Sequence, residues 1–151
     1  MQSFFSGFIK KLYLPRYPEL KVSDDYNIRE LEQNSFYVLS LGANKKYREW
    51  PYKYYAKIAQ KIHNKTGWLG LICGAENEFH LGENIKKLCD APLQNYAGQT
   101  TLSELTSLLV KSQILISNET GTAHIANAVG TPTVCIFCLL YTSALPTILL
   151  V

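Results

Sequence analysis

From residue 36 onward, short apolar runs rich in β-forming residues alternate with longer amphipathic stretches. We predict five strands, at residues 37–41, 69–73, 94–97, 114–117 and 133–137. Each run leads into a turn or into the start of an amphipathic stretch. Strands that alternate with helices in this way are typical of a parallel sheet covered by helices. The pattern therefore predicts an α/β domain over residues 36–137.

The first predicted helix begins at Pro51, a residue suited to the first helical turn, and runs to about residue 64. Its buried face should consist of apolar residues at helical spacing, namely Tyr55, Ile58, Ala59 and Ile62. A second helix is predicted over residues 78–89. A fourth is predicted over residues 121–129, where Gly130 and Pro132 end it.

The third predicted helix starts at Thr101, because Thr101 and Glu104 have the spacing of a capping box. Four leucines should form its buried stripe: Leu102, Leu105, Leu108 and Leu109.

The two ends of the chain differ from this pattern. Residues 1–35 contain prolines and turn-forming residues, and we interpret them as a connector or the remnant of a preceding domain. Within them, residues 4–12 have the pattern of a short basic amphipathic helix, which is consistent with contact at a membrane surface or with packing against a neighbouring domain. Residues 138–151 form an atypical apolar tail, and we expect the domain end to be truncated there.

Composition narrows the class of protein. The chain has 151 residues, of which 47% are hydrophobic and 18% charged, as in a globular domain with a sizeable core. A net charge of +3, from 15 basic and 12 acidic side chains, is too small an excess to indicate nucleic-acid binding. We find no secretory signal, and the apolar tail is too short to span a bilayer. We therefore expect a cytoplasmic protein.

Four cysteines, at positions 73, 89, 135 and 138, are predicted to be reduced thiols. Cys135 and Cys138 have the spacing of a redox motif. However, Cys135 lies within an apolar strand-like run instead of at a helix N-terminus, where a thiolate would be favoured. This position favours core packing.

Ligands of open parallel sheets bind beyond the carboxyl ends of the strands, so the residues that follow each strand are candidates for a site. A glycine turn and a basic loop follow the first strand at residues 42–50, where Lys45, Lys46 and Arg48 have the charge to neutralise a diphosphate. The alternative for these cations is a solvated loop. Glu78 follows the second strand, and its carboxylate is suited either to sugar hydroxyls or to capping the next helix.

The fourth strand leads through Thr120 and Gly121 directly into a helix of small residues. The free N–H groups of such a helix, together with its dipole, favour a phosphate. Gly121 allows close approach of a ligand, and Thr120 and Thr122 add hydroxyl groups. His124 lies one turn further on, where a lone histidine favours a structural role unless its context indicates a ligand.

The order of five short motifs resembles glycosyltransferase family 9, the ADP-heptose:lipopolysaccharide heptosyltransferases and their relatives. The motifs are Gly-Ala at 42–43 with Arg-Glu-Trp-Pro at 48–51, Gly-Ala-Glu-Asn-Glu at 74–78, residues 97–105, Ser-Asn-Glu-Thr-Gly-Thr-Ala-His at 117–124, and Gly-Thr-Pro-Thr-Val at 130–134. Each is a weak signal alone. Five in the family's order are specific.

The resemblance implies the C-terminal, donor-binding half of a GT-B enzyme, with a Rossmann-like sheet and no metal or other cofactor. The donor would be a nucleotide-sugar, with ADP-heptose as the default, and the acceptor a lipopolysaccharide core bound through the missing N-terminal domain, which carries the catalytic base. This chain alone would then be an inactive fragment that binds the donor without completing the transfer. Such an enzyme would work at the inner face of the bacterial inner membrane. Matching the family's donor contacts gives Asn44, Arg48, Glu78, Thr101, Leu102, Glu119, Thr120, Gly121 and His124. Glu119 stands where the family usually has an aspartate that contacts the donor sugar.

Three other classes of protein are alternatives to this interpretation. A non-catalytic nucleotide-binding module is the main alternative, because the acceptor half has no counterpart before residue 36. A dinucleotide-dependent oxidoreductase is disfavoured, since no Gly-x-Gly-x-x-Gly follows the first strand. A thiol redox protein would require a low thiol pKa at Cys135 or Cys138.

Overall fold

The computed structural model describes residues 31, 34–43, 45–137 and 147–150. Six strands form one sheet: β1 (Phe36–Ser40), β2 (Leu69–Cys73), β3 (Leu93–Asn95), β4 (Leu115–Asn118), β5 (Thr133–Phe137) and β6 (Thr147–Leu150). The helices are α2 (Tyr52–Thr66), α3 (Phe79–Leu88), α4 (Leu102–Lys111) and α5 (Gly121–Ala128), with short 3-10 turns η1 (Lys46–Arg48) and η2 (Glu76–Glu78).

The strand order in the sheet is β3-β2-β1-β4-β5-β6. The first five strands pair in parallel, which confirms the predicted parallel sheet, whereas β6 runs antiparallel to β5. Chain order runs outward from β1 to β3 and then returns to β4 on the other side of β1. This reversal is the topological switch point at which doubly wound folds bind their ligands.

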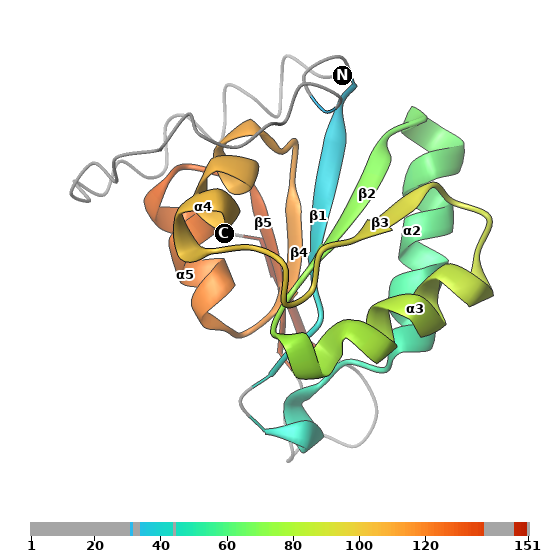
Figure 1. Ribbon diagram of the computed structural model, residues 1–151, viewed down its shortest axis with the longest axis horizontal. Helices are drawn as coiled ribbons and strands as arrows, with labels where there is room; N and C mark the ends of the chain where they lie inside the picture. The colour runs from blue at the N-terminus through green and yellow to red at the C-terminus, as the bar shows by residue number, and fades with distance from the viewer. Residues whose placement is uncertain (1–30, 32–33, 44, 138–146, 151) are drawn as a thin grey trace.

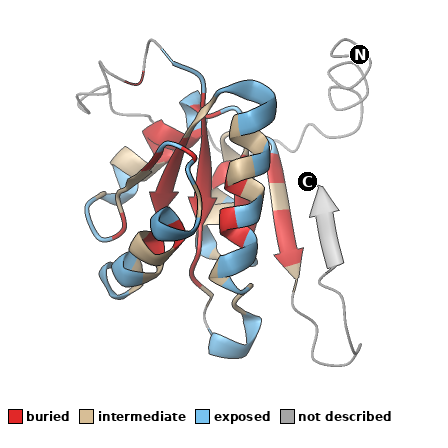
Figure 2. Cartoon of the chain, turned by 90° about the vertical axis from the view of Figure 1, so that its right-hand side faces the viewer, coloured by how far each residue is buried: buried red, intermediate tan, exposed pale blue. Residues whose placement is uncertain are grey.

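Helices cover both faces of the sheet (Figure 1). Tyr37 and Leu39 of β1 pack with Tyr55 and Ala59 of α2 in the core on one face. Val38, the residue between them, packs with Leu108 of α4 in the core on the other face. Because successive side chains of a strand point to opposite faces, a strand covered on both sides is apolar throughout. β1 is buried along its whole length, and the burial colouring of Figure 2 shows the central strands of the sheet in red.

Several predicted elements agree with the structure closely. β2 and β5 have the predicted bounds, and Thr101 caps α4 through the predicted box: its hydroxyl accepts from the Glu104 N–H at 3.3 Å, while Glu104 Oε2 accepts from the Thr101 N–H at 2.6 Å. On α2, Tyr55 and Ala59 are buried as predicted, while Ile58 and Ile62 are partly buried.

Two local predictions were wrong. Leu102 does not lie in the buried stripe of α4; it is 68% exposed, because it is the first residue of the helix and lies beyond the carboxyl edge of the sheet. The third strand is shorter than predicted and ends at Asn95. The chain turns immediately afterwards, with the Gln99 N–H donating to the Tyr96 carbonyl and Gly98 at φ +73°.

Part of the predicted tail is a strand: residues 147–150 pair with β5, with Val134 opposite Leu150. The predictions for Asn44, Cys138 and the amphipathic segment 4–12 lie outside the described residues. Within the described part of the chain, no helix has the length and apolar character needed to cross a bilayer.

The described cysteines are free thiols. Burial raises the pKa of Cys73 to about 12. Burial also raises the pKa of Cys135, and the nearby Glu119 charge adds to the effect. A raised pKa disfavours the thiolate, so the packing interpretation of Cys135 holds and redox catalysis by this thiol is disfavoured.

Candidate functional site

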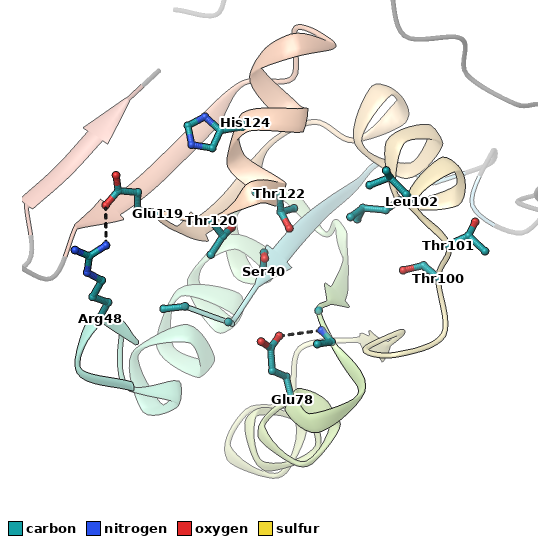
Figure 3. A pocket seen from close by; sticks show the side chains of 16 residues that line it. Ser40, Arg48, Glu78, Thr100, Thr101, Leu102, Glu119, Thr120, Thr122 and His124 are labelled. Carbon is teal, nitrogen blue, oxygen red and sulfur yellow. Dashed lines mark hydrogen bonds and ion pairs between the residues drawn. The ribbon is translucent and has the colours of Figure 1, made fainter. Parts of the chain in front are cut away.

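A cavity of about 680 Å³ opens at the carboxyl ends of the strands, over the switch point between β1 and β4 (Figure 3). It is lined by Ser40, Gly42, Ala43, Arg48, Gly74, Ala75, Glu78, Thr100, Thr101, Leu102, Leu105, Glu119, Thr120, Gly121, Thr122 and His124. Eight of the nine residues predicted from the sequence are in this set, and the ninth, Asn44, lies outside the described residues. The fold thus brings together motifs that are far apart in the sequence.

The cavity has two chemically different ends. The basic end comprises Arg48, Thr120, Gly121 and His124, with Glu119 beside them. The acidic end comprises Glu78, Thr100, Thr101 and Leu102. In Figure 3 the labelled residues of the basic end lie to the left of Ser40 and Thr122, Leu102, Thr100 and Thr101 lie to their right, and Glu78 lies below Ser40.

Arg48 reaches the basic end from η1, the short turn that follows β1. Its guanidinium Nη1 lies 3.9 Å from Glu119 Oε2, and the two side chains are 49% and 52% exposed. An ion pair this long and this exposed contributes little to stability. Since a guanidinium carries five N–H donors, Arg48 retains most of its hydrogen-bonding capacity for a ligand.

The N-terminus of α5 forms the other part of the basic end. Thr120 is its N-cap, in an extended conformation, and the Thr120 hydroxyl lies 3.0 Å from Ser117 Oγ. The first N–H groups of any helix lack partners within it, and the helix dipole favours an anion there. A Cβ added at Gly121 would meet no atom within 4 Å, so this glycine leaves space in the cavity itself.

At the acidic end, two glycines make room for the Glu78 carboxylate. A Cβ at Gly42 or at Gly74 would collide with the carboxylate oxygens of Glu78. Oε2 accepts from the Ala75 N–H at 3.1 Å. Burial raises the pKa of Glu78 above its usual range; the Ala75 hydrogen bond opposes this, and the charge of Glu49 adds to it. The carboxylate therefore lies in a position where it would gain from additional hydrogen-bond donors.

The rim of the acidic end is the turn that precedes α4. Gly98 donates its N–H to the Gly74 carbonyl at 2.8 Å, and a Cβ at Gly98 would meet the backbone of Glu76. This close contact places the turn next to η2. Exposed Leu102 then offers an apolar surface beside the hydroxyls of Thr100 and Thr101.

Sequence reasoning missed Ser40 and Thr100 as lining residues. Ser40 is the last residue of β1, so the rule that ligands lie beyond strand ends was sufficient to find it. Thr100 directly precedes the N-cap of α4 in the stretch that follows β3, so the same rule covers it.

A basic end at a helix N-terminus suits an anion such as a phosphate, and the Glu78 carboxylate at the other end suits a ligand that carries hydroxyl groups. The described residues contain no group of three or more His, Cys, Asp or Glu arranged to hold a metal ion. The fold and the site therefore define a Rossmann-like α/β domain with a cavity at its topological switch point.

The comparisons with known proteins identify the family. The sequence matches the model of glycosyltransferase family 9 (heptosyltransferase) over residues 5–145, and the chain belongs to that family. Lipopolysaccharide core heptosyltransferase OpsX of Haemophilus influenzae is 32% identical over 99 residues, which are 64% of this chain and 28% of that protein. The chain thus matches little more than a quarter of its relative's length.

Solved structures confirm the fold. ADP-heptose lipopolysaccharide heptosyltransferase II of E. coli superposes with a TM-score of 0.73 at 22% identity, over 82% of this chain and 41% of that one. E. coli heptosyltransferase WaaC, solved with ADP-2-deoxy-2-fluoro heptose, has a TM-score of 0.60 at 16% identity, over 85% and 41%. The architecture is therefore that of the Rossmann-like domains in GT-B glycosyltransferases, as the sequence predicts.

Proposed function

We propose that the cavity binds the nucleotide-sugar donor of a glycosyltransferase that moves a heptose from ADP-heptose to a lipopolysaccharide-type acceptor. The observation that carries this proposal is the meeting of Arg48 with the N-terminus of α5 over the switch point of the sheet. Family membership supports it, and so does the ADP-sugar bound by the structurally similar WaaC.

Each end of the cavity has its own role in this proposal. At the basic end, Arg48 and the N–H groups at Thr120 and Gly121 bind the diphosphate, while Glu119 and His124 face the sugar. At the acidic end, Glu78 accepts hydrogen bonds from the ribose hydroxyls, and Leu102 with Thr101 borders the base. Asn44 belongs to the same set by its place in the sequence motif, although it lies outside the described residues.

These roles suggest how the site contributes to transfer. An acceptor hydroxyl bonds to the anomeric carbon of the sugar and gives its proton to a base, while the bond between that carbon and the diphosphate breaks and negative charge grows on the departing phosphate oxygens. Donors already aimed at those oxygens stabilise the transition state more than the ground state. In this proposal Arg48 and the α5 amides supply those donors.

Calorimetric titration of the chain with ADP, UDP and GDP tests donor binding directly. We expect ADP to bind most tightly, because the structurally similar WaaC binds an ADP-sugar. A folded protein, verified by circular dichroism, that gives no binding heat with any of the three would overturn the proposal.

A second measurement separates an enzyme from a non-catalytic nucleotide-binding module. The chain is incubated with ADP-heptose and a heptose-free lipopolysaccharide acceptor, and ADP release is followed with time. Release that depends on the acceptor supports transfer. Because the family resemblance assigns the acceptor and the catalytic base to an N-terminal domain, the assay also includes the N-terminal domain of a related heptosyltransferase. Tight ADP-heptose binding with no release above the rate measured without this chain then favours the binding module.

A further inference from the structure

Asn118, the last residue of β4, is fully buried and uses both polar atoms of its side-chain amide. Its Oδ1 accepts from the Trp50 N–H at 3.2 Å. Its Nδ2 donates to the Leu41 carbonyl at 2.7 Å and also lies 3.4 Å from the Gly42 carbonyl. One side chain therefore connects β4 to two places that are 68 to 77 residues away in the sequence.

Those two places flank the segment that carries Arg48. Leu41 and Gly42 leave the carboxyl end of β1, and Trp50 ends the basic segment, which we define as residues 45–50. The segment is short: in η1, the Arg48 N–H donates to the Lys45 carbonyl at 2.8 Å, and the Glu49 N–H donates to the Lys46 carbonyl at 3.2 Å. Asn118 therefore bonds to the backbone on both sides of the stretch that carries Arg48.

The carboxyl end of β4 also leads into the N-terminus of α5, which forms the other part of the basic end. Glu119 and Thr120 follow Asn118 directly in the chain, and Thr120 caps α5. Asn118 therefore links the segment that carries Arg48 to the segment that carries the α5 amides, and the length of this link governs the distance between them. The Arg48 to Glu119 pair has too long and too exposed a geometry to set that distance itself.

Packing strengthens the attachment at Trp50. The Trp50 ring stacks on Tyr54, with ring centroids 5.3 Å apart, and meets Tyr55 edge-on at 5.0 Å. The Tyr55 hydroxyl donates to the carbonyl of Ser40, the last residue of β1, at 3.2 Å. These contacts join the basic segment to α2 and β1, and Asn118 joins that assembly to β4.

We infer that Asn118 is a positioning residue: it holds Arg48 in reach of the α5 N-terminus and so determines affinity for the diphosphate of the ligand. The inference rests on the proposed function. An amide is required because the site presents one donor and two acceptors. An ionised aspartate would retain the acceptor toward Trp50 but would turn a carboxylate oxygen toward the carbonyls of Leu41 and Gly42.

A double-mutant cycle tests whether Asn118 acts through Arg48. Calorimetry with ADP at pH 8 is carried out on the wild-type protein, Asn118→Asp, Arg48→Ala and the double variant. We expect Asn118→Asp to weaken ADP binding about tenfold when Arg48 is present and less than about twofold when it is absent. Adenosine affinity should stay within about twofold, since adenosine has no diphosphate. Equal losses in both backgrounds would overturn the inference.

Two further readouts complete the test. Protonating the introduced aspartate restores a donor toward Leu41, so the ratio of ADP affinities between Asn118→Asp and wild type should return toward one as the pH falls from 8 to about 5.5. A ratio independent of pH would contradict the inference. Asn64→Asp makes the same charge change at an exposed position of α2 and should leave ADP binding unaltered.

Hydrogen exchange at the Trp50 amide needs no nucleotide and thus keeps this inference separate from the proposed function. Asn118→Leu, or Asn118→Ser if the leucine variant does not fold, should speed that exchange about tenfold or more. Unchanged protection of Trp50 would overturn the role of Asn118, whatever ADP does. Faster exchange in a protein that never binds ADP would support the positioning role while the proposed function fails.

Discussion

The basic and acidic ends of the cavity are built by different means. At the basic end, one long, half-exposed arginine meets a helix N-terminus, and Gly121 leaves open space where any other residue would place a side chain. At the acidic end, the space beside Gly42 and Gly74 is already filled by the Glu78 carboxylate of the same chain. One end leaves room for a ligand's charge, and the other holds a carboxylate in place.

This difference indicates how each end should discriminate among ligands. If the proposed function holds, the contacts of Arg48 and the α5 amides at the basic end matter only for molecules that carry phosphates. Contacts at the acidic end should affect nucleosides and nucleotides alike, since both have a ribose and a base. Comparing ADP with adenosine therefore separates the two ends in a single series of titrations.

Removing Arg48 should give the largest effect. Arg48→Ala deletes the charge-assisted hydrogen bonds to the diphosphate, and we expect ADP affinity to fall by about 1.5–3 kcal/mol while adenosine affinity stays unchanged. Lys65→Ala removes an equal charge from the far end of α2 and serves as the control for net charge. Equal losses for ADP and adenosine would show that the basic end does not act through phosphate.

Filling the space at Gly121 should have the next largest effect. The added methyl group of Gly121→Ala meets no atom of the free protein, so it should not destabilise the fold. The free energy of unfolding should be equal to that of wild type or higher by up to about 1 kcal/mol, because alanine has a higher helix propensity than glycine. ADP binding should nevertheless weaken by about 1–2 kcal/mol, since the methyl group enters the ligand's space. Urea unfolding and calorimetry on the same samples measure both.

An ADP affinity equal to that of wild type in Gly121→Ala would mean that the diphosphate does not approach the α5 N-terminus. A large loss of stability would instead mean that the space beside Gly121 is not open.

The sheet and most of the site could be predicted from sequence because both rest on local signals. Apolar runs of strand length between amphipathic stretches fix the parallel sheet, and the parallel sheet brings all strand ends to one edge. Arg48, Glu78 and Thr120 then come together by topology alone. No side-chain geometry is needed to bring these motifs to one edge.

What the sequence could not supply depends on long-range contacts. Leu102 fits a helical stripe by spacing, yet the position of α4 relative to the sheet exposes it. In the sequence, Gly42 and Gly74 look like ordinary turn glycines, and only the structure shows that the Glu78 carboxylate occupies the space beside both of them. Asn118 is one polar residue at a strand end, and only the arrangement of β1 and β4 reveals its three partners.

Removing the apolar surface at Leu102 should affect adenosine and ADP equally. Leu102→Ser loses about 1 kcal/mol of affinity for each, because the side chain would otherwise cover part of the base. Stability should change little, since the leucine is 68% exposed. Val110→Ser, an exposed apolar residue near the other end of α4, is the matched control. A loss confined to ADP would place the base elsewhere.

The smallest effect should be a dependence of stability on pH that originates at Glu78. Burial raises the pKa of this carboxyl group in the folded protein, so over the interval between its usual value and the raised value the folded state holds more protons than the unfolded state. The contribution of Glu78 to the free energy of unfolding therefore declines as the pH rises through that interval. Glu78→Gln does not titrate and retains an oxygen to accept the Ala75 N–H.

Urea unfolding of both proteins from about pH 4 to 7 measures the difference. The free energy of unfolding of Glu78→Gln relative to wild type should increase with pH and then level off. Glu76→Gln makes the same change of charge at an exposed position of the same turn and serves as the matched control. A relative stability that falls with pH would mean that Glu78 is stabilised in its ionised form by the protein alone. In that case the acidic end would gain nothing from ligand hydroxyls, and the contrast between the two ends would be lost.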